Sequence, residues 1–290
     1  FTTAGGRKHE VFPDHRVKTD SGVKKARAVE EGDKLLTPLE IDIETEDVEQ
    51  INVLDKLDSE NVMIRNLEET VNEAIDYLGG LKAASEKIGI NKKTLGNYKY
   101  RDSIPSEVFA ELADKTNISY PEDAEIAAKR DKVSLPASIT VDKNLMKLLG
   151  YYVAEGHIRK SEKKGEEFYQ VAFAYGEEEL KNEIVECIEN IFDKEPSIEE
   201  NTITLSSRLA YDFFKGLEMG ENAHNKRVPD LVEKLPEEKV SHFLSAYFAG
   251  DGSVEKGKLH VQATSVSREL LEDIDFLLKR FGIYARYKTE

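Results

Sequence analysis

Two segments of the 290-residue chain end in the same pattern of small residue, acid and glycine. Residues 148–156 have the sequence LLGYYVAEG, and residues 244–252 have the sequence LSAYFAGDG. Each is an apolar helix pattern that places a carboxylate, Glu155 or Asp251, directly before the last glycine. Two carboxylates at paired helix ends repel unless a cation lies between them, and oxygen ligands with open water positions suit Mg²⁺. The sequence therefore predicts a divalent-metal site at Glu155 and Asp251.

Small residues explain how the two helices would bring these acids together. Gly150 and Ala154 lie four apart in the first segment, and Ala246 and Gly250 take the same positions in the second. Small residues at this spacing let two helix backbones approach closely, so we expect a pseudo-twofold helix pair. Either segment alone has a simpler interpretation, a buried helix ended by glycine with an exposed acid. That interpretation does not explain the shared register.

The same order of elements, a hairpin and then a helix, follows each segment. The predicted hairpins and helices are residues 157–175 and 177–192 in the first copy, and 253–265 and 267–283 in the second. The first copy continues with a hairpin at 197–207 and a helix at 208–217, whereas the second reaches only a predicted strand at 283–289. Alternate hairpin residues predict a curved polar sheet surface that includes Arg159, Gln170, Lys258, His260 and Gln262.

A basic stretch at residues 79–101 carries six Lys or Arg side chains against one acid. Its apolar period and Gly89 predict two short helices at helix-turn-helix spacing, with Asn91 as the N-cap of the second. The outward residues would contact phosphates, with a possible Asn-to-adenine contact, and are Lys92, Lys93, Asn97, Tyr98 and Arg101. A small bundle with a solvated lysine face explains the pattern as well. A helix is expected from Ser103, and a linker at 121–138.

Composition limits the remaining functions. The net charge is −16, half of it within residues 39–61, so the field of the whole chain opposes a polyanionic partner and basic surfaces must be local. The single cysteine, Cys187, excludes an intramolecular disulfide and disfavours a cysteine zinc site, and we interpret it as a core residue. No apolar run or leader indicates membrane or secretion, so we expect the reducing cytoplasm. A start at Phe1 fits a fragment of something longer.

With these residues in view, residues 139–290 resemble the LAGLIDADG homing endonucleases in the monomeric form with two motifs per chain. The resemblance implies an α+β fold with a two-fold pseudo-symmetric saddle of αββαββα halves, residues 139–235 and a truncated 236–290. It also implies hydrolysis of one phosphodiester bond on each strand of double-stranded DNA. Glu155 and Asp251 would hold the divalent metal and position the attacking water.

A further similarity is carried by Asn225-Lys226-Arg227-Val228-Pro229, which resembles the Lys-x-Ile/Val-Pro block of intein-borne members. The resemblance implies that Lys226 reaches the active site, where an ammonium group can stabilise charge on the phosphate. A basic linker at the start of a helix, with Pro229 in its first turn, explains the same residues equally well.

The amino end resembles part of a Hint splicing domain through Gly6-Arg7, Phe12-Pro13-Asp14-His15, Ser21-Gly22 and Gly32-Asp33. Residues 1–50 would then be a partial all-β Hint segment, and residues 51–138 an acidic connector with a helix-turn-helix DNA-recognition insert. The resemblance implies that His15 hydrogen-bonds the amino-terminal scissile peptide. Phe12 stands where the block usually has Thr, and no terminal His-Asn pair is present. The chain alone is not expected to splice, and a host extein polypeptide is an expected partner in the precursor.

Two other functions compete with the endonuclease. A DNA-binding regulator or RNA-splicing helper of the same fold would lack the chemistry, but it has no need of carboxylates beside phosphates, where they cost affinity. A helix-turn-helix transcription factor with a ligand domain would not explain the repeat. The two acids, Glu155 and Asp251, favour the nuclease, which we expect to be a monomer.

Overall fold

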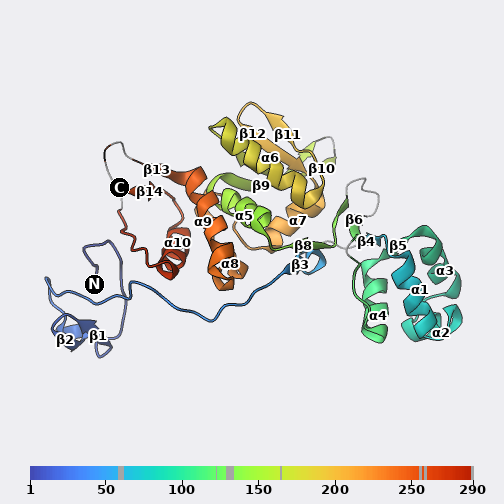
Figure 1. Cartoon of the computed structure of the whole chain (residues 1–290), viewed down its shortest axis with the longest axis horizontal. Helices are drawn as coiled ribbons and strands as arrows, with labels where there is room; N and C mark the ends of the chain where they lie inside the picture. The colour runs from blue at the N-terminus through green and yellow to red at the C-terminus, as the bar shows by residue number, and fades with distance from the viewer. Residues whose placement is uncertain are drawn as a thin grey trace. The chain divides into compact units, whose positions relative to one another are not determined.

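The computed structural model describes residues 1–57, 62–121, 123–128, 134–163, 165–254, 257 and 260–288. The chain divides into two compact units, residues 1–45 with 271–290 and residues 46–270. Each unit is described by itself. Helices and strands are mixed along the chain (Figure 1), so the fold class is α+β, as the sequence predicts.

Two helices that end in the acidic motifs lie side by side at the centre of the larger unit (Figure 1). They are α5 (Lys143–Glu155) and α9 (Glu237–Asp251). The side chain of Asp142 begins α5 by accepting a hydrogen bond from the Leu145 amide at 3.0 Å, as an N-cap does. Most of α5 after its first turn is buried, which is typical of a helix inside a core rather than on a surface.

The backbones of α5 and α9 approach so closely that their glycines have no room for a side chain. A Cβ atom added to Gly150 would lie 2.3 Å from the Phe243 carbonyl oxygen and 2.9 Å from the Ala246 Cβ. One added to Gly250 would lie 2.7 Å from the Ala154 Cβ. Equivalent positions of the two motifs therefore face each other, so the helices run parallel and their acids emerge at the same end. This confirms the contact predicted from the small residues.

A four-stranded antiparallel sheet follows α5, in the order β11-β12-β10-β9. Its strands are β9 (Gly156–Lys163), β10 (Glu166–Ala174), β11 (Ser197–Glu199) and β12 (Thr202–Ser206), and the helices of the same half are α6 (Glu178–Phe192) and α7 (Arg208–Gly216). Ile158, Val171 and Leu205 are buried in register on one face. Cys187 is buried on α6, as expected of a core residue. The order from α5 to α7 is helix, hairpin, helix, hairpin, helix, as the sequence predicts.

A shorter version of this order surrounds α9. The elements are α8 (Asp230–Lys234), α9, β13 (Gly252–Val254), β14 (Val261–Ala263) and α10 (Arg268–Arg280). The two hairpins start in the same register, since Gly156 pairs with Phe173 and Gly252 pairs with Ala263. The strand expected at 283–289 is wrong for the described residues 283–288, which belong to no strand.

A second sheet, of order β5-β4-β6-β7, accompanies the helices of the basic stretch. The strands are β4 (Val62–Arg65), β5 (Ser103–Pro105), β6 (Glu125–Ala128) and β7 (Ser134–Pro136), while β3 (Gln50–Asn52) pairs with β8 (Ser138–Thr140). The linker expected at 121–138 is therefore wrong, because Ile126 and Leu135 pair across a buried ladder. The residues from Ser103 likewise form a strand before the helix begins.

Four short helices complete this part of the chain. They are α1 (Glu68–Tyr77), α2 (Leu81–Ile88), α3 (Lys92–Arg101) and α4 (Ser106–Thr116). Gly89 ends α2 with a φ of 72°, a left-handed conformation that glycine adopts without strain. The Asn91 side chain accepts a hydrogen bond from the Lys93 amide at 2.8 Å, which confirms the predicted N-cap of α3.

The smaller unit joins residues near both ends of the sequence. Its hairpin consists of β1 (Arg16–Thr19) and β2 (Gly22–Lys25), and a 3₁₀ turn follows at residues 26–28. Arg7 donates to Asp275 on α10 at 2.6 Å, and its guanidinium lies 4.3 Å from the centroid of the Tyr284 ring. The Tyr287 amide donates to the Gly5 carbonyl at 2.8 Å. An ion pair to α10 and a cation–π contact to Tyr284, just after that helix, thus bind Arg7 to the carboxyl-terminal part of the chain.

We expect Gly150→Ala to lower the free energy of unfolding by about 1–3 kcal/mol, because the added methyl group clashes with α9. Gly176→Ala is the matched control, since a Cβ atom there meets nothing within 4 Å. Urea unfolding followed by circular dichroism measures both. Equal stability of the two variants would contradict the close helix contact.

Candidate active site

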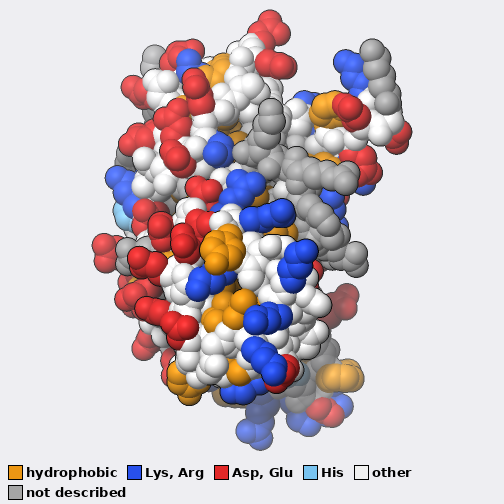
Figure 2. Space-filling view, turned by 90° about the vertical axis from the view of Figure 1, so that its right-hand side faces the viewer, with side chains coloured by type: hydrophobic (Ala, Val, Ile, Leu, Met, Phe, Trp, Pro, Cys, Tyr) orange, Lys and Arg blue, Asp and Glu red, His pale blue; other side chains and the backbone are white. Residues whose placement is uncertain are grey.

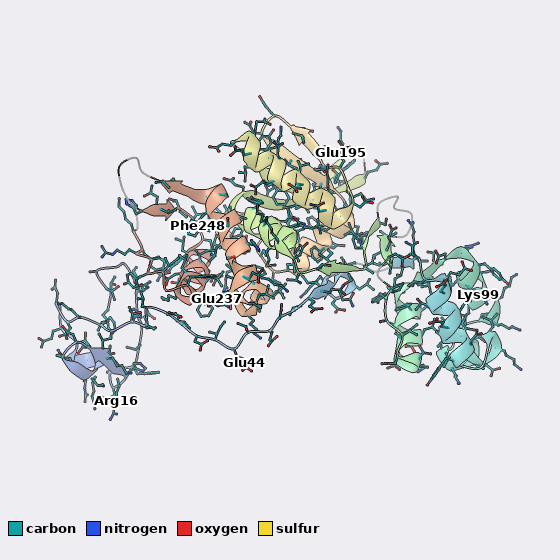
Figure 3. The ribbon with its side chains drawn as sticks, in the orientation of Figure 1. Arg16, Glu44, Lys99, Glu195, Glu237 and Phe248 are labelled. Atoms are coloured by element: carbon teal, nitrogen blue, oxygen red, sulfur yellow. The ribbon has the colours of Figure 1, made fainter. Side chains whose placement is uncertain are left out.

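The two motif acids are the last residues of the paired helices. Glu155 ends α5 and Asp251 ends α9, and both side chains are half-buried. A Cβ atom on Gly250 would lie 3.3 Å from the Cγ of Glu155, so the acid of α5 reaches the last turn of α9. Figure 3 labels Glu237 and Phe248 on α9, at its start and near its acidic end. Helix C-termini carry partial negative charge, so this end of the pair attracts cations.

Burial and mutual repulsion make full ionisation of the two acids costly. Burial, with repulsion from Glu155, raises the pKa of Asp251 to about 7, although Lys226 opposes the shift. Burial also raises the pKa of Glu155, and Lys226 again opposes it. A divalent cation between the carboxylates would favour their charged forms. The two acids that the sequence predicts to act together are thus electrostatically coupled.

Lys226 lies buried beside this pair, with only 3% of its surface exposed. Its Nζ donates to the carbonyl oxygen of Gly156 at 2.6 Å and to that of Tyr152, and lies 3.7 Å from the centroid of the Tyr152 ring. Burial lowers the pKa of Lys226 to about 7, while Asp251 and Glu155 act in the opposite direction. The ammonium group therefore satisfies carbonyls at the end of α5 and counters the charge of both acids.

A tight turn places Lys226. Gly220 has a φ of 82°, and a Cβ atom there would lie 2.0 Å from the Asn225 carbonyl oxygen, so only glycine fits. The Tyr152 hydroxyl donates to the Gly220 carbonyl at 2.8 Å, and the Ser267 hydroxyl donates to the Lys226 carbonyl at 2.8 Å. The other explanation of residues 225–229, a basic linker at the start of a helix, also fits the structure, because Pro229 is the N-cap of α8. The same five residues both begin a helix and deliver an ammonium group.

The residues present fit a hard divalent cation. Among the described residues, no group of three or more His, Cys, Asp and Glu side chains forms a metal cluster. Glu155 and Asp251 would therefore supply two carboxylates and leave the other positions to water or phosphate oxygens. Mg²⁺ is commonly bound in this way, through one or two carboxylates with several waters retained.

The polar face of the sheet beside the acids carries two of the residues predicted to contact DNA. Arg159 Nε donates to Gln170 Oε1 at 2.6 Å, and Gln170 Nε2 donates to Ser206 Oγ at 3.2 Å. His157, two residues before Arg159, lies on the same face, and neither His157 nor Ser206 was singled out from the sequence. The alternation of β9 from Gly156 onward is the signal that would have found His157.

The other predicted site residues are more scattered. Gln262 is exposed on β14 opposite Ser253, and His260 is exposed just before that strand, whereas Lys258 lies outside the described residues. His15 belongs to the smaller unit, where it is exposed just before β1, and its amide donates to the Phe12 carbonyl at 2.9 Å.

Helix α3 presents the basic surface expected from the sequence. Lys92, Lys93, Asn97 and Arg101 are exposed and Tyr98 is half-buried, while Tyr100, which sequence reasoning missed, is 85% exposed. Figure 2 shows Lys and Arg side chains gathered on the face toward the viewer, with Asp and Glu at its left margin. Figure 3 labels Lys99 on the same helix.

The cations of α2 and α3 differ in their surroundings. On α2, Lys82 lies 4.0 Å from Glu86, and Lys87 Nζ donates to the Leu78 carbonyl at 3.1 Å. Within the part of the chain that the structure describes, no ion pair is formed by Lys92, Lys93 or Arg101. The cations of α3 are thus open to an anionic ligand.

Comparison with known proteins identifies the second motif and its surroundings. Residues 238–290, from α9 onward, match the family model described as LAGLIDADG-like domain. This part of the chain is therefore similar to a LAGLIDADG-like domain. No helix in the described ranges is both long and apolar enough to span a membrane.

Two relatives and one solved structure are similar to larger parts of the chain. The DNA polymerase II large subunit of Thermococcus kodakarensis is 33% identical over 97% of the chain, which spans 15% of that protein's length. The replication factor C small subunit of Methanocaldococcus jannaschii is 30% identical over 58% of the chain and 9% of that protein. The homing endonuclease I-WcaI bound to its DNA recognition sequence aligns over 48% of the chain and 67% of its own, with 18% identity and a TM-score of 0.33.

Mg²⁺ is expected to stabilise the folded chain through Glu155 and Asp251. At ten times its dissociation constant it adds about 1.4 kcal/mol, or about 2–3 °C in Tm for a chain of this size. The shift should be larger at pH 8 than at pH 6, because Asp251, with its pKa of about 7, is mostly protonated at the lower pH and protons then compete with the cation.

Calorimetry with and without Mg²⁺ measures this shift. It should disappear in Glu155→Gln with Asp251→Asn and persist in Glu189→Gln with Asp230→Asn, which removes the same charge from exposed helical sites. The same shift in both double variants would exclude a cation site at the motif acids.

Proposed function

We propose that this chain is the endonuclease part of an intein and hydrolyses double-stranded DNA at a specific site with the aid of a divalent metal ion. The observation that carries the proposal is the parallel contact of α5 and α9, which ends in Glu155 and Asp251 with the buried Lys226 near enough to interact with both charges. A protein that only binds DNA gains nothing from two half-buried carboxylates facing a polyanion.

The proposed chemistry is the addition of water to the phosphorus of a DNA phosphodiester. A new P–O bond forms, the P–O bond to one neighbouring sugar breaks, and the products are a phosphate end and a hydroxyl end. Bound Mg²⁺ supplies a more acidic water and neutralises charge on the phosphate. Glu155 and Asp251 hold the metal and orient the water, and Lys226 balances the charge of the acids and stabilises the phosphate oxygens.

The proposed arrangement on DNA follows the order of the elements. Residues 139–235 and 236–290 form the two halves of a pseudo-symmetric saddle, whose polar sheet faces, with Arg159, Gln170 and Gln262, follow the major groove. Residues 51–138 add a second, helix-turn-helix contact through α3. One chain contains both acids, so a monomer is sufficient to cut both strands.

The names of the relatives support the proposed intein context. Matching segments occur in proteins named a DNA polymerase II large subunit and a replication factor C small subunit, and they form 15% and 9% of those proteins. A segment that is shared by proteins of different names, and is small relative to each, fits an inserted element. We propose that residues 1–50 belong to its Hint splicing module, with His15 near the scissile peptide and the extein as partner.

Replacing Asp251 by Asn should abolish Mg²⁺-dependent cleavage, by more than about 100-fold in rate, while leaving DNA affinity within a few-fold, because only the metal-holding charge is lost. The substrate is a plasmid that carries the DNA polymerase II large-subunit gene without the segment that codes for this chain. Gel analysis of linear product measures cleavage, and Asp230→Asn is the control for charge. Wild-type binding without cutting would instead support a DNA-binding regulator.

Replacing Lys92 and Lys93 together by Ala should weaken DNA binding and reduce the salt slope of log K by up to about 2, about one unit for each lost phosphate contact. Fluorescence anisotropy from 50 to 200 mM salt measures this slope. The control is Lys181→Ala on α6 together with Lys194→Ala just after α6, which should leave the slope unchanged. An unchanged slope for the α3 variant would make α3 a solvated helix with no role in binding.

A further inference from the structure

His157 lies beside the motif acids in the sequence but has no role in the chemistry proposed above. It is the first residue after the Glu155-Gly156 end of the first motif, and it pairs with Ala172 on β10, which in turn pairs with Thr204 on β12. The next row of the same face holds Arg159, Gln170 and Ser206. On β9, His157 is therefore the first side chain of the polar sheet face after the motif acid.

The surroundings of His157 leave its ring open to a ligand. The side chain is half-buried, and its neighbour in the row is the small Ala172. Among the described residues, its imidazole has no hydrogen-bond partner, whereas the next row is occupied by the Arg159–Gln170–Ser206 hydrogen bonds. Burial lowers the pKa of His157, and the nearby charges of Arg159 and Lys226 lower it further, so an anion bound at the ring would have two cationic neighbours.

The second half offers a different side chain at the same position. Gly252 is followed by Ser253, which pairs with Gln262, while Gly252 itself pairs with Ala263, as Gly156 does with Phe173. The two positions are therefore equivalent in register but not in chemistry. Ser253 carries a short hydroxyl, whereas an imidazole extends farther and donates an N–H in either of its protonation states.

We infer that His157 contacts the phosphate cut by the first half and donates a hydrogen bond to one of its non-bridging oxygens, so that the two strands are cut by chemically unequal half-sites. The inference rests on the proposed endonuclease function. A fixed donor aimed at an oxygen whose charge grows in the transition state lowers the barrier to the reaction. The contact exists in one half only, so its loss should slow the cutting of one strand and spare the other.

The test is strand-specific cleavage under single-turnover conditions. The substrate is a DNA duplex from the DNA polymerase II large-subunit gene without the segment that codes for this chain, and it spans the point of insertion. Each strand carries a different fluorophore, and the chain cuts the duplex in Mg²⁺. His157→Ala should slow one strand by about 10- to 100-fold and change the other by less than about 2-fold, so that nicked duplex accumulates. His157→Gln, which keeps an N–H donor, should recover part of the lost rate. Ser253→Ala, the matched variant of the second half, should not slow the same strand.

Each outcome decides the inference. Equal slowing of both strands by His157→Ala, or no slowing in a variant with wild-type Tm, would overturn it. Slowing of one strand by Ala with no recovery by Gln would show that the side chain acts through packing rather than as a donor, and would also overturn it. Wild type is first compared with Glu155→Gln. If the wild-type chain cuts no faster, the endonuclease proposal itself fails, and this result does not depend on any His157 variant.

Discussion

The architecture of the larger unit depends on the contact between the backbones of α5 and α9. Gly150 against Ala246 and Ala154 against Gly250 leave no room for larger side chains, and the equivalence of these pairs makes the helices parallel. Parallel helices end together, so the acids, the helix C-termini and the starts of two hairpins all meet at one place. A larger residue at any of these four positions would separate the acids as well as the helices.

This concentration of negative charge requires compensation from within the protein. Lys226 supplies part of this compensation while buried, through its charge and through two hydrogen bonds from its Nζ to the carbonyls of Tyr152 and Gly156 at the end of α5. Burying the Lys226 ammonium group costs free energy, and burial lowers its pKa. The site therefore raises the pKa of its two acids and lowers the pKa of its lysine. Shifts of this kind are typical of functional centres.

Much of this arrangement follows from local pattern. The motif helices, the hairpins after them and the N-cap at Asn91 are visible in the sequence because each depends on residues a few positions apart. The strands β6 and β7 were missed because Pro121 and Pro136 indicate a linker, while the pairing that makes Ile126 and Leu135 a ladder is a tertiary contact. His157 was missed although the alternation of β9 places it on the same face as Arg159. Lys258 lies outside the described residues, so its contact with DNA stays a prediction.

The contacts of Arg7 with Asp275 and Tyr284 affect the order in which parts of the chain can fold during synthesis. Its ion-pair partner, Asp275, lies 268 residues farther along the sequence, so Arg7 emerges from the ribosome long before the helix that receives it exists. Contacts of such sequence separation form late, because a long loop must be closed first. The unit of residues 46–270 can complete its core during synthesis, whereas the contacts of Gly5 and Arg7 must wait for α10 and the residues that follow it. Assembly of the unit that contains His15 is thus timed by the completion of the second acidic half.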